Sequence, residues 1–175
     1  MSSIDLVILG MVIEKPRSAY DIQKDVEYHH FSRWTKISTP SIYKKVIQLE
    51  EKGLLQSVTV KESNMPEKAV YSLTASGEQE FEKLMREIST QPIRFFLDFN
   101  AVIVNLESLS PELQKECVEN IAASVQELKA YLEQNIQEKE GLAEIPATGM
   151  AVLRQQLVLA EAIENWIAAS VLPTE

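Results

Sequence analysis

The first part of the chain carries apolar side chains at helical spacing, broken by short polar segments. Within residues 4–12 they recur every three or four positions, and Pro16 closes the segment, which predicts a first helix. Ser18, with Asp21 three residues later, is typical of a capped helix start. A second helix is therefore expected from Ser18 to about His29.

A third helix is predicted after a connecting segment. Ser38 or Thr39 can cap its start, and Pro40 suits a first turn, where a missing N–H costs nothing. Gly53 can end the helix, because glycine readily adopts the left-handed conformation that follows a last turn. Three short helices are thus expected before residue 54.

Beyond the third helix the period of the pattern changes to two. Residues 54–60 and 69–73 are rich in β-branched side chains, and turn-forming residues 63–66 lie between them, which predicts a β-hairpin. Thr74 can then cap a fourth helix whose apolar positions return to helical spacing. This order is typical of a winged helix-turn-helix, which we assign to residues 1–90.

Pro92 begins a different kind of sequence. Residues 93–106 are so apolar that we expect a helix buried on more than one side. Ser110 can then cap a long helix that ends by Gly141 and Pro146. The apolar seam predicted for this long helix consists of Leu113, Cys117, Ile121, Val125, Leu128, Leu132 and Ile136.

A final helix from about Ala147 is predicted to have two apolar faces. One face carries Leu153, Leu157, Ala160 and Ile167, and the other carries Val152, Leu159, Ile163 and Trp166. A lone chain of this length cannot cover both, so residues 91–175 are expected to form a helical dimerisation domain. The expected dimer contacts are Leu153, Leu157, Ile163, Trp166 and Ile167. The fold class predicted for the whole chain is mainly α with a small β-hairpin.

The charge of the chain is unevenly divided. The 175 residues have a formal net charge of −9. Residues 1–90 hold 12 Lys and Arg against 13 Asp and Glu, whereas residues 91–175 hold 5 against 13. The window 29–61 is locally basic, with six Lys and Arg against two glutamates. A local cluster of this kind promotes phosphate binding whatever the charge elsewhere in the chain.

The third predicted helix combines an apolar face with a polar one. Ile42, Val46 and Leu49 fall at i, i+4 and i+7 and should face the core. The opposite face is then expected to carry Ser41, Lys44, Lys45, Gln48 and Lys52. Lys and Gln can hydrogen-bond base edges and phosphates in the major groove, and N–H groups at a helix start can bind phosphate. This helix is therefore predicted to read DNA, with Lys61 and Lys68 near the hairpin tip on the neighbouring backbone.

Catalysis and metal binding have no support in the sequence. His29 and His30 are the only histidines, and they lack further ligands at metal spacing. Cys117 lies on an apolar seam, where a buried structural thiol is expected rather than a nucleophile. No cofactor is expected. The apolar stretches are far shorter than the roughly 18 residues of a membrane helix, so a cytoplasmic protein is the default.

Several motifs stand in a characteristic order. They are residues 8–16, Ala19-Tyr20-Asp21-Ile22, Ser41-Ile42-Tyr43, Leu49-Glu50-Glu51-Lys52-Gly53-Leu54 and Tyr71-Ser72-Leu73-Thr74 with Gly77. In combination they resemble the PadR family of transcriptional regulators, most strongly over residues 4–80. The remainder is similar to the virulence-activator-like C-terminal domain of that family, which builds homodimers. One departure is Ser18-Ala19, where family members often have His-Gly.

The resemblance implies roles for individual residues. Tyr43 matches the tyrosine near the start of the recognition helix, and Tyr20 matches that of the second helix, so both are expected near DNA phosphates, with packing at the core edge as the alternative. The complete predicted DNA interface is Tyr20, Lys24, Lys36, Thr39, Ser41, Tyr43, Lys44, Lys45, Gln48, Lys61 and Lys68.

The resemblance also implies phenolic or other hydrophobic effectors. Aromatic side chains could line a pocket for such a ligand, with packing in the core as the alternative. The residues predicted for this pocket are Trp34, Phe95, Phe96, Phe99 and Trp166.

The predicted function is a homodimeric transcriptional repressor that a small hydrophobic ligand releases from DNA. Its two reading helices would enter successive major grooves about 34 Å apart on an inverted-repeat operator. The alternative is a winged-helix module that binds protein and not DNA.

Overall fold

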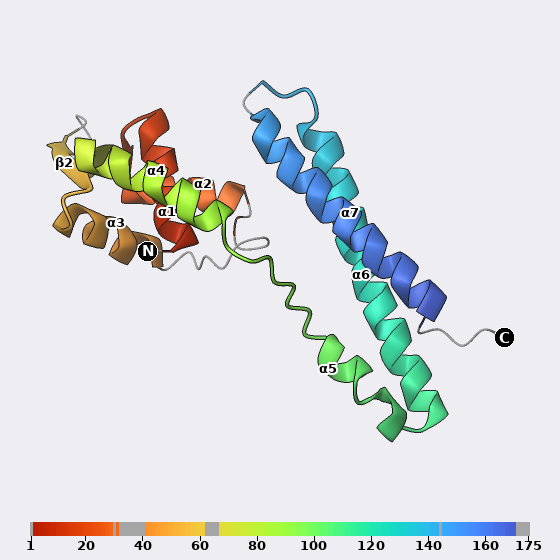
Figure 1. The fold of residues 1–175 in the computed structure, drawn as a ribbon. Helices are drawn as coiled ribbons and strands as arrows, with labels where there is room; N and C mark the ends of the chain where they lie inside the picture. The colour runs from red at the N-terminus through yellow and green to blue at the C-terminus, as the bar shows by residue number, and fades with distance from the viewer. Residues whose placement is uncertain (1, 30, 32–40, 62–66, 144, 171–175) are drawn as a thin grey trace. The chain divides into compact units, whose positions relative to one another are not determined.

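The computed structural model of the protein divides into two units, residues 1–93 and 94–175 (Figure 1). The described residues are 2–29, 31, 41–61, 67–143 and 145–170. The predicted caps Ser38 and Thr39, with Pro40, and the predicted turn 63–66 lie outside these ranges.

The first unit is a winged helix-turn-helix, as predicted. Its elements are α1 (Ser3–Glu14), β1 (Arg17–Ser18), α2 (Ala19–Tyr28), α3 (Ser41–Glu51), β2 (Leu55–Val60), β3 (Lys68–Leu73) and α4 (Ala75–Ser89). One apolar core joins them, in which Ile8 of α1, Ile22 of α2 and Leu84 of α4 are completely or almost completely buried. The helical periodicity of the sequence therefore corresponds to real core contacts.

The sheet of the first unit has three antiparallel strands in the order β1-β3-β2. The predicted hairpin is confirmed, with Leu55 opposite Leu73 and Val60 opposite Lys68. The strand β1, which pairs Arg17 with Tyr71, was not predicted. Two residues are too few to show an alternating pattern in the sequence.

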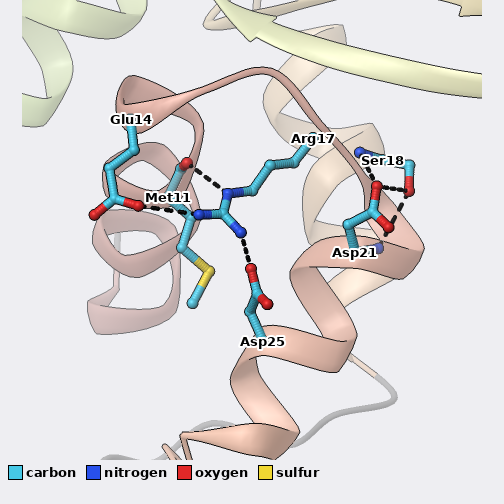
Figure 2. Close-up of polar contacts among 6 residues, drawn as sticks. All are labelled: Met11, Glu14, Arg17, Ser18, Asp21 and Asp25. Atoms are coloured by element: carbon cyan, nitrogen blue, oxygen red, sulfur yellow. Dashed lines mark hydrogen bonds and ion pairs between the residues drawn. The ribbon is translucent and has the colours of Figure 1, made fainter. Parts of the chain in front are cut away.

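Side-chain caps fix the helix starts. The Ser18 hydroxyl accepts a hydrogen bond from the Asp21 N–H at 3.1 Å, and the Asp21 carboxylate accepts from the Ser18 N–H and hydroxyl at 3.2 and 2.7 Å (Figure 2). Thr74 accepts from the Gly77 N–H at 3.0 Å at the start of α4. Gly53, with a φ of +71°, follows α3 as expected of a glycine after a last turn. The predicted capping residues within the described ranges are thus confirmed.

A guanidinium group joins the end of α1 to α2. Arg17 donates to the Met11 carbonyl and to the Glu14 carboxylate, both at 3.0 Å, and it forms an ion pair with Asp25 (Figure 2). Its side chain is mostly buried, so the charge depends on these partners. The contact fixes the corner at which β1 leads into α2.

The second unit consists of a pair of long helices preceded by short helical turns. Its elements are α5 (Asn100–Ile103), the 3-10 helix η2 (Leu106–Ser108), α6 (Pro111–Lys139) and α7 (Ala147–Ser170). Helices α6 and α7 lie side by side (Figure 1), with Val118, Val125 and Ile167 buried between them. Lys129 Nζ also lies 2.8 Å from Glu164 Oε2. The two predicted long helices are confirmed.

The predicted apolar helix over 93–106 is wrong. Within this stretch only the short α5 and the start of η2 are helical, and Ile93 is 84% exposed. Three consecutive β-branched residues, Val102 to Val104, disfavour continuous helix. A helix that is apolar all round also needs cover on several sides.

The apolar seam predicted for α6 is only partly right. Val125 and Leu132 are buried, but Leu113 and Leu128 are exposed. The buried stripe instead runs through Val118, Val125 and Leu132 at intervals of seven residues. The apolar positions of α6 form two overlapping stripes, and helical spacing alone does not say which one meets α7.

Candidate nucleic-acid interface

One face of helix α3 packs against the core, and the opposite face is exposed to solvent. Ile42, Val46 and Leu49 are buried as predicted. Tyr43 and Lys44 are exposed, which brings the aromatic and one cationic residue of the predicted interface onto the same outer face. Ser41 and Gln48 are half-buried at its edge. The outer face can therefore donate hydrogen bonds to phosphates and base edges.

Lys45 does not share this outer face, contrary to the prediction. Its Nζ lies 3.1 Å from Oδ1 of Asp5 on α1, and its side chain is 29% exposed. The sequence contained a signal for this position, because Lys45 precedes the buried Leu49 by four residues and therefore lies on the same side of the helix. Two adjacent lysines of α3 thus point in different directions.

Ile47 also lies on the outer face of α3, although it was not predicted there. It is 49% exposed, and it follows Tyr43 by one helical turn. Its position could have been found from the spacing, because residues 42, 46 and 49 already define the buried side. An exposed apolar side chain on a reading helix can contact the methyl group of thymine.

The start of α2 adds a second cationic contact surface. Tyr20 and Lys24 are both exposed, and Lys24 Nζ lies 4.9 Å from the centre of the Tyr20 ring. A hydrogen bond with the Tyr20 hydroxyl raises the pKa of Lys24 above its ordinary value. A lysine amine is protonated near neutral pH even at its ordinary pKa, so Lys24 carries the charge that a phosphate contact requires.

The hairpin formed by β2 and β3 carries the predicted wing lysines. Lys61 is exposed, and its Nζ lies 3.4 Å from Oε1 of Glu67. Lys68 is half-buried at the start of β3. An exposed ion pair of this kind is weak, so Lys61 can exchange Glu67 for a phosphate at little cost. The predicted interface residues Lys36 and Thr39 lie outside the described residues.

The predicted effector residues are only partly brought together. Phe99 and Trp166 stack, with ring centres 6.2 Å apart and an angle of 25° between the planes. Phe95 and Phe96 are exposed, and Trp34 lies outside the described residues. The structure thus brings two of the five predicted residues into contact with each other.

The predicted dimer contacts differ in how much surface they offer. Leu153, Leu157 and Ile163 are half-buried, and Trp166 is exposed. Ile167 packs in the unit's own core, which leaves its side chain no surface for a partner chain. Val158, which is 61% exposed, lies on a different side of α7 from Leu153 and Leu157.

The described part of the chain shows neither a metal-binding cluster nor a membrane-spanning helix. It contains no group of three or more His, Cys, Asp or Glu side chains that could hold a metal ion. None of the helices in these same ranges is long and apolar enough to cross a membrane.

Comparison with known proteins supports the regulator resemblance. Residues 8–83 match the model of the "Transcriptional regulator PadR-like family". A solved structure of Bacillus subtilis PadR in complex with operator DNA is 22% identical, with a TM-score of 0.81 over 97% of this chain and 98% of that chain. No curated protein sequence matches this chain significantly.

Two further solved structures are similar over nearly the whole chain. Bacillus subtilis PadR in complex with p-coumaric acid is 19% identical, with a TM-score of 0.78 over 98% of this chain and 96% of that chain. The Vibrio cholerae virulence activator AphA is 20% identical, with a TM-score of 0.71 over 95% of this chain and 94% of that chain. At these identities the similarity establishes the fold.

Proposed function

Because residues 8–83 form a domain of the PadR-like family of transcriptional regulators, we propose that this chain is a sequence-specific DNA-binding repressor. The observation that carries the proposal is the outer face of α3, where Tyr43 and Lys44 are exposed on a helix that is firmly packed on its other side. Helices of this kind enter the major groove and contact base edges and phosphates.

Two further surfaces of the first unit support the proposal. The Tyr20–Lys24 pair on α2 and Lys61 on the wing are exposed and can neutralise phosphates beside the groove. The solved structure of Bacillus subtilis PadR with operator DNA shows that a protein of this fold binds DNA. A protein-binding winged helix remains the alternative outcome of the experiment below.

The experiment is selection of bound duplexes from a random DNA pool at two salt concentrations. The wild type is expected to enrich an inverted repeat whose half-sites lie about 34 Å apart. Lys44→Ala should weaken binding to the selected operator. It should also reduce the slope of log K against log salt by about 0.9, the value for one lost phosphate contact. Lys45 is left intact, because its removal would leave Asp5 without its cation.

A control variant makes this result specific. Lys83→Ala removes another exposed lysine, one carried by α4 and not by α3, and should leave the selected motif unchanged. Absence of enrichment by the wild type at either salt would contradict DNA binding and favour the protein-binding alternative.

We propose further that the second unit forms the homodimer and binds a small aromatic effector. Exposed apolar side chains on α7 support dimerisation, and the stacked Phe99 and Trp166 support an aromatic ligand. The structure of Bacillus subtilis PadR with p-coumaric acid provides the ligand to test first. Added p-coumaric acid should release the selected operator from the protein. In a separate titration without DNA it should quench the tryptophan fluorescence of the protein. Release without any quenching, or neither effect, would contradict this proposal.

A further inference from the structure

The first turn of α1 holds a carboxylate that is almost completely buried. Asp5 is 2% exposed, and it precedes the buried Ile8 and Leu9 by three and four residues, so it lies on the core side of the helix. Oδ2 of Asp5 accepts hydrogen bonds from the Ser2 backbone N–H at 2.7 Å and from the Ser2 hydroxyl at 3.0 Å. Oδ1 receives Lys45 Nζ at 3.1 Å. One carboxylate thus joins α1 to α3.

This contact is directional, whereas the apolar contacts of α3 are not. Burial of Ile42, Val46 and Leu49 stabilises the helix on the core, but hydrophobic burial changes little when a helix turns or slides slightly. A charge-assisted hydrogen bond weakens quickly when its distance or angle changes. A buried carboxylate that loses its cation is also costly. The ion pair therefore fixes both the rotation of α3 about its axis and its position along α1.

The element that is fixed in this way is the one that presents the outer face. Tyr43, Lys44 and Ile47 are all carried by α3 and move with it. Side chains that recognise a ligand must be held within about 0.5 Å of their productive position. Small changes in the rotation of α3 would therefore reduce recognition of a specific DNA sequence more than general attraction to DNA.

We propose that Lys45 is a positioning residue, which through its ion pair with Asp5 orients α3 for DNA recognition and does not itself contact DNA. The inference rests on the proposed DNA-binding function. It assigns different roles to two adjacent lysines. Lys44 faces outward and contacts DNA, whereas Lys45 faces α1 and holds the helix.

The substitution Asp5→Asn separates this role from direct DNA contact by the sign of its effect. If Lys45 contacted phosphate, loss of the Asp5 carboxylate would free its amine and remove a nearby negative charge, so DNA affinity would rise. If Lys45 positions α3, the same substitution removes its anchor, so affinity for the operator falls. The two roles thus predict opposite changes in affinity.

The experiment measures Kd by fluorescence anisotropy for the selected operator and for a scrambled duplex over a series of salt concentrations. Asp5→Asn and Lys45→Met should each weaken operator binding about tenfold, comparable to a lost base contact, and change binding to the scrambled duplex little. Both should keep the wild-type slope of log K against log salt. Lys44→Met, the matched control, should lower that slope by about 0.9. Lys45→Arg retains the cation and should restore operator binding.

Correct folding is checked by circular dichroism for each variant. If a single variant does not fold, the double variant Asp5→Asn/Lys45→Met removes both charges and leaves no unpaired charge in the core. The loss of binding free energy in the double variant should equal the loss in either single variant and not the sum of the two, because both substitutions break the same ion pair.

Three results would overturn the inference. Tighter operator binding by Asp5→Asn, or a lower salt slope for Lys45→Met matching that of Lys44→Met, would show that Lys45 contacts DNA and would leave the proposed function intact. Equal binding of operator and scrambled duplex by the wild type would overturn the proposed function itself, and the positioning role with it.

Discussion

Asp5 is charged inside the first unit because its hydrogen bonds outweigh its burial. Burial alone would raise the pKa of the carboxyl group. The hydrogen bonds from the Ser2 N–H and the Lys45 amine together lower it by more than burial raises it, so the pKa lies below the ordinary value. The folded protein therefore holds fewer protons than the unfolded chain in acid. Its free energy of unfolding rises with pH in that range.

The substitution Asp5→Asn should reduce this pH dependence. In the wild type, the contribution of Asp5 is complete above the unfolded-state pKa of about 3.9 and is lost as pH falls through the lower pKa of the folded state. At pH 7 we expect Asp5→Asn to cost about 2 kcal/mol, below the value for a fully buried pair, because Lys45 still reaches water. Urea unfolding from pH 7 to pH 3 measures both effects.

The control for this measurement is Asp98→Asn, which changes an exposed aspartate. It should leave the free energy of unfolding of the first unit unchanged at every pH. A pH dependence of Asp5→Asn as steep as that of the wild type would contradict a lowered pKa for Asp5.

Lys44 and Lys45 show which features of the candidate site could be predicted from the sequence and which could not. The sequence predicted a cationic reading helix, and the exposure of Tyr43 and Lys44 agrees with it. The inward direction of Lys45 depends on Asp5, which lies 40 positions away and on another helix. Its half-buried position had a signal in the helical spacing, but its partner had none, because a pairing between distant elements requires the fold.

At the scale of elements, Gly77 shows why a glycine stands in the first turn of α4. A Cβ at this position would lie 2.1 Å from the Leu54 carbonyl oxygen, much closer than atoms can approach. Thr74, which caps the same turn, donates a hydrogen bond to the Gly53 carbonyl at 2.7 Å. The start of α4 therefore packs directly on the backbone between α3 and β2, and only glycine fits there.

Gly77→Ala should destabilise the first unit by about 3 kcal/mol or more, because the added methyl group meets rigid backbone and not a movable side chain. Thermal unfolding followed by circular dichroism measures the change. Gly149→Ala in α7 is the matched control, since its nearest atom would be 3.7 Å away, and it should be neutral or slightly stabilising. Equal melting temperatures for Gly77→Ala and the wild type would contradict the close approach.

The elements that were predicted correctly are those with a local signal. The caps at Ser18 and Thr74 and the β-branched residues of β2 are properties of a few neighbouring residues. Residues 93–106 failed because a strongly apolar segment does not form a helix unless other elements cover it. Such cover is a property of the whole assembly and has no local signal.

At the scale of the whole molecule, the exposed side of α7 supports a second copy as its partner. Val158 lies on this side together with small apolar residues at helical spacing, namely Ala151, Ala162 and Ala169. A helix surface with small side chains allows close packing of another helix. Two copies related by a two-fold axis would also match the symmetry of an inverted-repeat operator.

Val158→Glu should therefore convert the proposed dimer to a monomer, because an interface formed by this side of α7 would bury a glutamate of each copy without a compensating charge. Light scattering after size exclusion should give twice 19.8 kDa for the wild type and a value near 19.8 kDa for the variant. Gln137→Glu adds the same charge at an exposed polar position of α6 and should keep the dimer mass.

The monomer can occupy one half-site at a time, so its operator affinity should fall while its affinity for a single half-site is kept. A wild type of monomer mass, or a Val158→Glu variant that retains the dimer mass, would show that α7 does not form the interface through this side.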